Sequence, residues 1–241
     1  TKGWHANIMY FFGHTQPESF MDFFQCLTER ASCRAFLPQE VSRNVLEKII
    51  TSANQSPSYM NSQPWEVLAV GGKTRERLVH KLLEKAANQA EPEPDLPFPV
   101  QWPETTGRRA TDHRMRRWRA LGIDSEDQSR IRDQFLANFR FYDAPWVLFV
   151  GVERTLTSWP IFDLGSFVHA LLLSAHAEGL GACPQAAPLS YPDVIRTELG
   201  ISDRLLLVLA IPLGYPDWEA PANSYRSSRK ELSEYVRFFE D

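Results

Sequence analysis

The chain has 241 residues, a length that can bury one sizeable hydrophobic core and is commonly a single domain. Hydrophobic residues (43%) and charged residues (23%) are present in the proportions of an ordinary globular protein. The net charge of −4 gives no reason to expect nucleic acid as a partner, and no apolar run approaches the ~20 residues that would span a membrane.

The N-terminus and the cysteines bear on the cellular setting. Residues 1–5 do not form a basic region followed by an apolar stretch, so no signal peptide is visible. The three cysteines, Cys26, Cys33 and Cys183, include no CxxC pair and cannot all be joined in disulfides. A reducing, cytoplasmic setting is therefore predicted.

Taken in chain order, the first part of the sequence predicts an irregular arm followed by alternating helices and a strand. Apolar residues recur at helical spacing before Pro57, which prevents that helix from continuing. A short apolar run then ends at Gly71 and Gly72, as a buried strand does. The predicted elements are an aromatic-rich arm over 1–23, a helix over 41–54, a strand over 65–70 and an amphipathic helix over 73–87.

The segment over 88–140 differs in character from its surroundings. Five prolines between 91 and 103 prevent regular structure, and arginines dominate 107–122. Segments of this length inside a compact domain are usually lids, binding segments or linkers. Because strands are predicted on both sides, we interpret 88–140 as a lid insertion within one domain that covers 1–241.

The second half of the chain predicts a helix that is apolar on nearly all sides. It covers 161–178, Asp163 is expected to cap it and Gly179 to end it. A helix without a polar face must be covered all round, so it belongs in the core or in a subunit interface. The other elements expected here are strands over 145–151 and 204–213 and a short helix over 192–199. Helices alternating with buried strands predict an α+β or α/β sandwich.

Four short motifs carry the strongest signal for function. They are Arg-Ala-Ser-Cys-Arg at 30–34, Ser-Pro-Ser-Tyr-Met-Asn-Ser-Gln-Pro-Trp at 56–65, Gly-Leu-Gly-Ala-Cys-Pro-Gln-Ala-Ala at 179–187 and Leu-Gly-Tyr-Pro-Asp at 213–217. In this order and at these distances they resemble the FMN-dependent nitroreductase family, from roughly residue 24 to the C-terminus. The long insertion and the Cys-Pro-Gln-Ala loop resemble the subgroup of that family with a lid.

The resemblance implies a fold and an assembly. The fold class is α+β: a nitroreductase-like three-layer sandwich whose central, largely antiparallel sheet is flanked by helices. The protein is expected to be an intertwined homodimer with two FMN sites at its interface, and 215–241 to be a C-terminal extension. The apolar helix over 161–178 agrees with a large buried interface.

Arginines near both ends of the chain are candidates for holding the FMN phosphate. The guanidinium fork matches phosphate oxygens, although a few surface arginines are by themselves more often only solvated. The resemblance implies that Arg30, Ser32 and Arg229 hold the phosphate, with Arg226 as a second C-terminal base. It places Arg34 beside the N1–C2 carbonyl side of the flavin, where a fixed cation stabilises the charge gained on reduction.

The motif at 56–65 is expected to contact the flavin ring. The amide of Asn61 can both donate and accept, which suits the pyrimidine edge, although Asn after a turn is often only a turn residue. By resemblance, Pro57 and Ser58 contact the flavin from the partner subunit.

The loop over 183–187 is expected to lie against the flavin edge. By resemblance, backbone N–H groups of Ala186 and Ala187 serve flavin N5 and O4, so small side chains suffice there. Cys183 is interpreted as a small apolar residue in a tight loop and not as a redox group. The cofactor-binding residues expected from this loop are Pro184, Gln185, Ala186 and Ala187.

Two further groups of residues bear on metal and substrate binding. His169 and His176, seven residues apart on an apolar helix, are more typical of a core or an interface than of a metal site, and no metal is predicted. The arginine-rich stretch is either a solvated helix face or a lid whose arginines attract the phosphates of NAD(P)H or an anionic aromatic substrate. The substrate residues expected, several of them able to stack on a flat ring, are Trp102, Arg117, Trp118 and Phe139.

The resemblance implies an oxidoreductase that uses FMN and NAD(P)H. Hydride passes to flavin N5 and then to a nitroaromatic or quinone-like acceptor in a ping-pong reaction, and no side chain is certain to be catalytic. Within the same fold, the alternatives are a reductive dehalogenase, for which no substrate clamp is identified, or another specialised flavin enzyme. A flavin-storage or redox-sensing protein is the alternative from a different class.

Overall fold

The computed structural model describes residues 21–156 and 158–240. The arm predicted over 1–23 therefore lies almost wholly outside the described residues. In the described part of the chain, no helix combines the length and the apolar character needed to cross a membrane.

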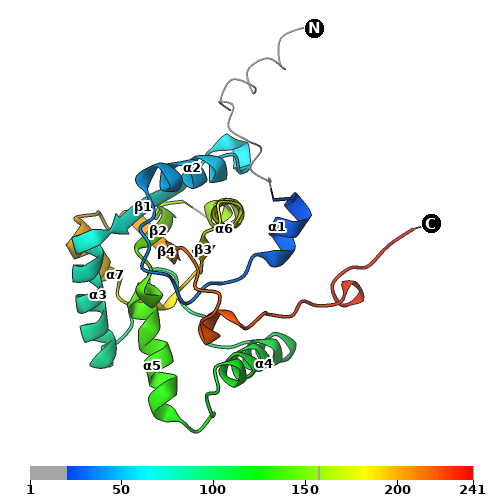
Figure 1. The fold of residues 1–241 in the computed structure, drawn as a ribbon. Helices are drawn as coiled ribbons and strands as arrows, with labels where there is room; N and C mark the ends of the chain where they lie inside the picture. Colours follow the sequence, from blue (N-terminus) through cyan, green and yellow to red (C-terminus); the bar gives the residue numbers. More distant parts are fainter. Residues whose placement is uncertain (1–20, 157, 241) are drawn as a thin grey trace, which may run out of the picture.

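A four-stranded antiparallel sheet forms the centre of the molecule (Figure 1). The strands are β1 (Trp65–Gly71), β2 (Trp146–Glu153), β3 (Gly181–Ala182) and β4 (Leu205–Gly214), in the spatial order β1-β2-β4-β3. Side chains along β2 alternate between the two faces of the sheet. Leu148 and Val150 enter one core cluster, and Val147 and Phe149 enter the other. The sheet thus separates two cores.

Helices cover both faces of the sheet and complete three layers (Figure 1). On one side lie α2 (Arg43–Ala53) and α6 (Trp159–Ala177), and on the other α3 (Gly72–Ala87), α5 (Gln128–Phe139) and α7 (Pro192–Leu199). Each amphipathic helix turns an apolar stripe to its own core. Ile49 of α2 and Leu171 of α6 share one cluster, whereas Leu78 of α3 and Ile195 of α7 share the other. The α+β three-layer fold predicted from the sequence is confirmed.

The sequence predicts the C-terminal end of α6 correctly but not its N-terminal end. Gly179 has a φ of +74° and closes the helix, with the Leu180 N–H donating to the Ala175 carbonyl oxygen at 2.8 Å. The prediction that Asp163 caps the helix is wrong, because α6 begins at Trp159 and Asp163 lies inside it. The buried Asp163 carboxylate instead accepts the backbone N–H of Tyr59 at 3.1 Å.

The insertion over 88–140 is mostly helical. The proline-rich stretch over 91–103 is irregular, as predicted, but α4 (Glu104–Ala120) and α5 follow it. Helix α4 buries none of its residues. It therefore lacks the apolar periodicity that makes the core helices recognisable in the sequence.

Candidate active site

An extended segment over 30–36 runs beside β3 at the sheet edge and carries the first motif. Ser32 forms a parallel bridge with Ala182, and the Cys33 N–H donates to the Ala182 carbonyl oxygen at 3.0 Å. Alternate residues of an extended chain point to opposite sides. Cys33 is fully buried, whereas Ser32 and Arg34 line a cavity. The Arg-x-Ser-x-Arg spacing thereby directs its polar side chains to one side.

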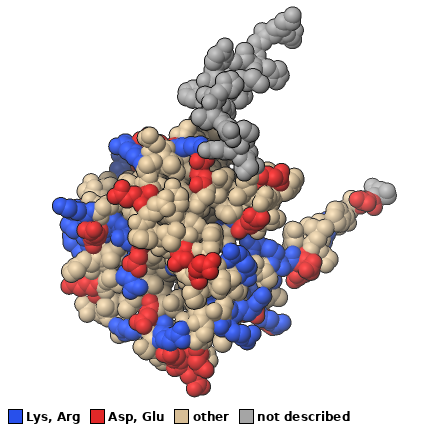
Figure 2. Space-filling model, in the orientation of Figure 1, with Lys and Arg blue, Asp and Glu red and all other residues tan. Residues whose placement is uncertain are grey.

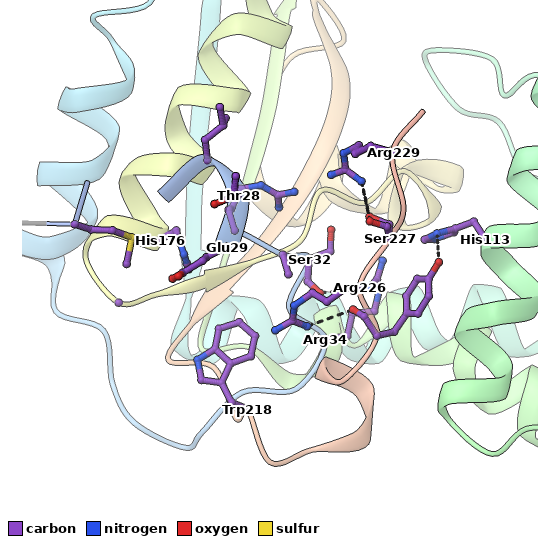
Figure 3. Close-up of a pocket in the computed structure, with 16 residues that line it drawn as sticks. Thr28, Glu29, Ser32, Arg34, His113, His176, Trp218, Arg226, Ser227 and Arg229 are labelled. Atoms are coloured by element: carbon purple, nitrogen blue, oxygen red, sulfur yellow. Dashed lines mark hydrogen bonds between the residues drawn. The ribbon is translucent and has the colours of Figure 1, made fainter. Parts of the chain in front are cut away.

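The cavity lies between this segment, the C-terminal end of α6, helix α4 and the chain after β4 (Figure 3). Its volume is about 920 Å³. That is within the range of cofactor and ligand sites, about 300–1,000 Å³. The predicted cofactor residues that line it are Arg30, Ser32, Arg34, Arg226 and Arg229. Residues nearly 200 positions apart in the sequence thus meet at one place, as Arg34 and Asn223 do with a separation of 189.

The cavity is strongly basic. Four arginines line it, against one carboxylate, that of Glu29. Among the described residues, none of the four forms a salt bridge. Burial, followed by the neighbouring Arg229, lowers the pKa of Arg30. Figure 2 shows basic side chains gathered beside α4, at the base of the C-terminal segment. Arg30 and Arg34 are half-buried, whereas Arg226 and Arg229 are exposed. Partly buried cations without carboxylate partners favour an anionic ligand.

Asn223 joins the two arginine-bearing segments. This side chain is 2% exposed, and its Oδ1 accepts the Arg34 backbone N–H at 2.7 Å. Its Nδ2 donates to the carbonyl oxygens of Ala35 at 2.8 Å and Asp217 at 2.7 Å. Asn223 could not be recognised from the sequence, since an asparagine in a Pro-Ala-Asn string indicates a turn and nothing more.

Trp218 fixes the second segment from the other side. The Arg226 guanidinium lies over its ring, 5.3 Å from the centroid (Figure 3). Arg226 also donates to the Asn223 carbonyl oxygen at 2.5 Å. Arg229 is held by the Ser227 hydroxyl, to which its Nη1 donates at 2.8 Å. The two C-terminal arginines are therefore preorganised before any ligand enters.

Helix α4 contacts the C-terminal segment across the cavity. The Tyr225 hydroxyl lies 3.2 Å from His113 Nδ1, and Arg116 donates to the Ser228 hydroxyl at 3.1 Å. Burial, together with nearby arginines, lowers the pKa of His113, so its neutral form is favoured in this basic surrounding. The arginine-rich helix is thus fastened over one end of the cavity, and no sequence pattern indicated His113 or Tyr225.

The motif at 56–65 lies elsewhere. Pro57 and Asn61 are exposed, and neither they nor Ser58 line the basic cavity. Asn61 has a left-handed φ of 57°, and the Ser58 hydroxyl accepts the Gln63 N–H at 2.9 Å. Within one subunit, the predicted contact of Asn61 with the site is not made.

The loop over 183–187 has one side chain turned away from the site. Gln185 is 4% exposed and donates from Nε2 to Asn138 Oδ1 at 3.1 Å, so its side chain does not line the basic cavity. Its backbone is also occupied, since its N–H donates to the Ala210 carbonyl oxygen at 2.7 Å. Ala186 is exposed and Pro184 partly so. Cys183 is buried, and burial raises its pKa, which agrees with its interpretation as an inert apolar residue.

The predicted substrate residues separate into three kinds. Phe139 is wrong as a stacking residue, because it is fully buried in the core against Tyr191. Trp118 is partly buried with the Arg114 guanidinium over its ring, and Trp102 is 53% exposed. Arg117 turns inward from α4 and donates to Gln134 Oε1 at 3.1 Å.

The two histidines of α6 are not equivalent. His176 lines the basic cavity, while His169 is exposed on another part of the helix. The pKa of His176 is lowered by burial. They do not converge on a common site.

The comparison with known proteins decides the family. The model of the protein family described as "Nitroreductase family" matches residues 27–215. The chain belongs to this family. Nitroreductase NfnB of Mycolicibacterium smegmatis is 34% identical over 212 residues, which cover 87% of this chain and 89% of that protein. Nitrobenzene nitroreductase of Ectopseudomonas oleovorans is 33% identical over 218 residues, covering 88% and 94%.

A solved structure gives the same result for the fold of this nitroreductase. The FMN-dependent nitroreductase NfnB from Mycobacterium smegmatis, in complex with NADPH, superimposes with a TM-score of 0.86 at 31% identity. The match covers 90% of this chain and 97% of that one.

The cavity fits a flavin nucleotide on its own features. Its arginines offer donors for a phosphate, and its volume suits a nucleotide-sized ligand. Arg34, whose backbone is fixed by Asn223, supplies a cation near the loop over 183–187. These are the residue types that an anionic cofactor with a polar ring edge requires.

Proposed function

We propose that this nitroreductase binds FMN in the basic cavity and uses NAD(P)H to reduce nitroaromatic or related quinone-like acceptors. The observation that carries the proposal is the set of four arginines, free of salt bridges among the described residues, around a nucleotide-sized cavity. The relatives named for nitrobenzene reduction and for dependence on FMN support it. When bound, FMN supplies the hydride chemistry, taking hydride from the nicotinamide and giving it to the acceptor.

The phosphate end of the site is assigned to Arg30, Ser32 and Arg229, with Arg226 beside them. All four line the cavity, and they come from the sheet-edge segment and the C-terminal segment. Two guanidinium groups on opposite sides can bind one phosphate bidentately. Arg229 contributes, after burial, to the lowered pKa of Arg30, and a dianion placed between the two guanidinium groups would offset that repulsion.

The ring end is assigned to Arg34. Its backbone is held by Asn223 at 2.7 Å and its Nη1 donates to the Ser32 carbonyl oxygen at 3.3 Å, so the cation has little freedom. A fixed cation beside N1 and the C2 carbonyl stabilises charge that develops there, without reorganisation at the moment of transfer. Pro184 and the backbone of Ala186 and Ala187 would form the opposing edge, since the short helix that begins at Ala187 leaves its first N–H groups without partners inside the helix.

A second copy of the chain would complete the site. Tyr59, Met60, Trp159 and Phe162 form an exposed apolar patch, and Met60 is 85% exposed. Exposed patches of this kind mark interaction surfaces.

A homodimer that buries this patch would bring Pro57, Ser58 and Asn61 of one copy to the cofactor of the other. Sedimentation of wild type should therefore give a dimer, and Met60→Asp should shift it toward monomer; a monomeric wild type would contradict this assembly.

The proposal also covers the contacts with the acceptor and the cellular setting. The exposed Trp102 and the partly buried Trp118 on the insertion remain the proposed contacts for a flat acceptor, with Arg117 behind them. The described cysteines are all free and buried, which supports a reducing, cytoplasmic setting.

The decisive experiment is an anaerobic stopped-flow titration of the purified protein that follows flavin absorbance. NADPH or NADH is added first, and a nitroaromatic second. We expect rapid bleaching and then recovery of the oxidised spectrum. Bleaching without recovery would point to another acceptor, slow or absent bleaching to flavin storage, and failure to bind FMN after reconstitution would overturn the proposal.

A further inference from the structure

The segment over 224–230, which carries Arg226 and Arg229, has few supports beyond its own residues. Just before it, Asn223 is bonded to the sheet-edge segment. The segment itself forms no helix or strand, and the hydrogen bonds of its two arginines go to residues at most three positions away. Two side-chain hydrogen bonds connect it to a distant part of the described chain, and both come from α4. The position of the two arginines therefore depends on this helix.

These two contacts, which we call the latch, lie on either side of Arg226. The Tyr225 hydroxyl is 3.2 Å from His113 Nδ1, and the two rings meet edge to face with 5.2 Å between their centroids (Figure 3). Arg116 Nη1 donates to the Ser228 hydroxyl at 3.1 Å. Burial and the neighbouring arginines lower the pKa of His113, so a neutral imidazole can accept the Tyr225 proton at Nδ1. Both rings line the basic cavity, so the latch is part of its wall.

Helix α4 has little besides the latch to hold it in place. None of its residues is buried. In the part of the protein that the structure describes, one hydrogen bond joins it to another helix or strand, from Arg117 to Gln134 of α5 at 3.1 Å. An irregular, proline-rich stretch leads into the helix, and Gly122, with a left-handed φ of 62°, follows it. A helix with no buried face and few bonds can open and close as a unit.

We propose that the latch closes α4 over the phosphate end of the cavity and thereby sets how fast FMN leaves. The inference rests on the proposed function, because Arg226 and Arg229 are assigned to the cofactor phosphate. The dependence is mutual: α4 holds the segment over 224–230 against the cavity, and a phosphate bound by that segment keeps it in place for α4. Riboflavin differs from FMN only in lacking the phosphate, so its release should not depend on the latch.

The test measures the dissociation rates of FMN and of riboflavin from the full-length protein, by the recovery of flavin fluorescence after dilution. Tyr225→Phe removes one neutral hydrogen bond of the latch and should speed the release of FMN about fivefold. Tyr225→Phe combined with Ser228→Ala removes both contacts and should speed it about twentyfold. Riboflavin should leave both variants at its wild-type rate.

Amide hydrogen exchange over 104–120 gives a second measurement. Bound FMN should slow exchange in α4 of the wild type more than bound riboflavin does, because only FMN holds the segment to which the helix is latched. The double latch variant should lose this difference between the two flavins.

Tyr235→Phe combined with Ser224→Ala is the matched control. Both side chains are exposed, neither lines the cavity, and the Ser224 hydroxyl donates locally to the Pro221 carbonyl oxygen at 2.8 Å. This variant should release both flavins at wild-type rates. The inference is wrong if wild type binds FMN and the double latch variant releases it at the same rate, if riboflavin leaves faster by the same factor as FMN, or if the control behaves like the latch variant. If wild type binds neither flavin, the proposed function fails, and this inference with it.

Discussion

Residues 30–36 and 56–63 carry motifs of equal clarity, yet they have different surroundings in the folded subunit. The first segment is bonded to the sheet edge and lines the basic cavity. The second is largely exposed, takes left-handed backbone at Met60, Asn61 and Gln63, and does not line that cavity. The first motif thus lies at the basic cavity of its own subunit, whereas the second would reach a cofactor only in the proposed homodimer. Substitutions in the first segment should disturb the subunit itself, and substitutions in the second should act mainly through assembly.

The largest effect is expected where the first segment meets the sheet. A Cβ on Gly181 would lie 2.7 Å from both Cβ and Sγ of Cys33. Gly181→Val should therefore push the segment off the edge and destabilise the protein by about 3 kcal/mol, measured by urea unfolding. FMN binding should be lost at the same time. Gly165→Ala, where a Cβ meets nothing within 4 Å in the subunit, is the control and should not destabilise the fold. Equal stability of Gly181→Val and wild type would show that the segment is not fixed by this contact.

Asn223→Ala removes the link between the two arginine-bearing segments. Three part-buried backbone groups each lose a hydrogen bond, and the Arg34 N–H loses its acceptor, so a loss of about 2 kcal/mol in unfolding free energy is expected, with weaker FMN binding. The matched control is Asn54→Ala, an exposed asparagine that accepts from Trp65 Nε1 at 2.8 Å and should cost about 0.5–1 kcal/mol. If the two variants lose the same unfolding free energy and bind FMN equally well, the buried position of Asn223 does not add to its contribution.

The contacts of Asn223 also show where sequence reasoning ends. The core helices and strands could be predicted, because residues such as Ile49 and Leu78 repeat with the period of the element they belong to. The arginines of the cavity were found through the family motif. Asn223 and Tyr225 meet partners 189 and 112 positions away, and no local pattern encodes such a contact. These side chains become visible only once the sheet edge, α4 and the C-terminal segment are placed together.

Burial was the other property that the sequence could not supply. Phe139 and Gln185 belong to motif-like strings, and both were assigned to ligands. In the structure Phe139 fills the core and Gln185 supports Asn138. For α4 the sequence allows both a solvated helix face and a lid, because this helix buries no residue and has no apolar stripe that would fix its place.

Arg34→Ala tests the chemistry of the first segment without disturbing its backbone. Asn223 holds the backbone N–H of residue 34, not its side chain, so the fold and much of the FMN should be retained. Reduction by NAD(P)H should slow by roughly tenfold and the flavin potential should fall, because a fixed cation is lost. Arg114→Ala, whose guanidinium lies over Trp118, is the control for removing an arginine and should leave both quantities unchanged. A wild-type rate of reduction in Arg34→Ala would place this side chain away from N1.

Cys33, the inward-facing neighbour of Arg34, gives a pH dependence. Burial raises the pKa of its thiol from 9.0 to about 11. The unfolded chain therefore ionises first, so stability is fully present below pH 9 and is lost as the pH rises toward 11. At pH 10 the loss should be about 1 kcal/mol. Urea unfolding at pH 8 and pH 10 measures it, and Cys33→Ala should remove this part of the alkaline decline; an unchanged decline would assign it to other groups.

The smallest effect on the subunit is expected in the second segment. The Ser58 hydroxyl accepts one N–H, that of Gln63 at 2.9 Å, at an exposed turn, so Ser58→Ala should change the unfolding free energy by no more than about 0.5–1 kcal/mol. Its effect on FMN affinity should nevertheless be about threefold, since the same hydroxyl would face the cofactor of the other copy. Ser52→Ala is the control, because this serine is also exposed and bonds only the Lys48 carbonyl oxygen of its own helix. If both serine variants bind FMN like wild type, the second segment has no part in the cofactor site. The segment over 30–36 would then belong to the site, and the segment over 56–63 would be only a structural turn.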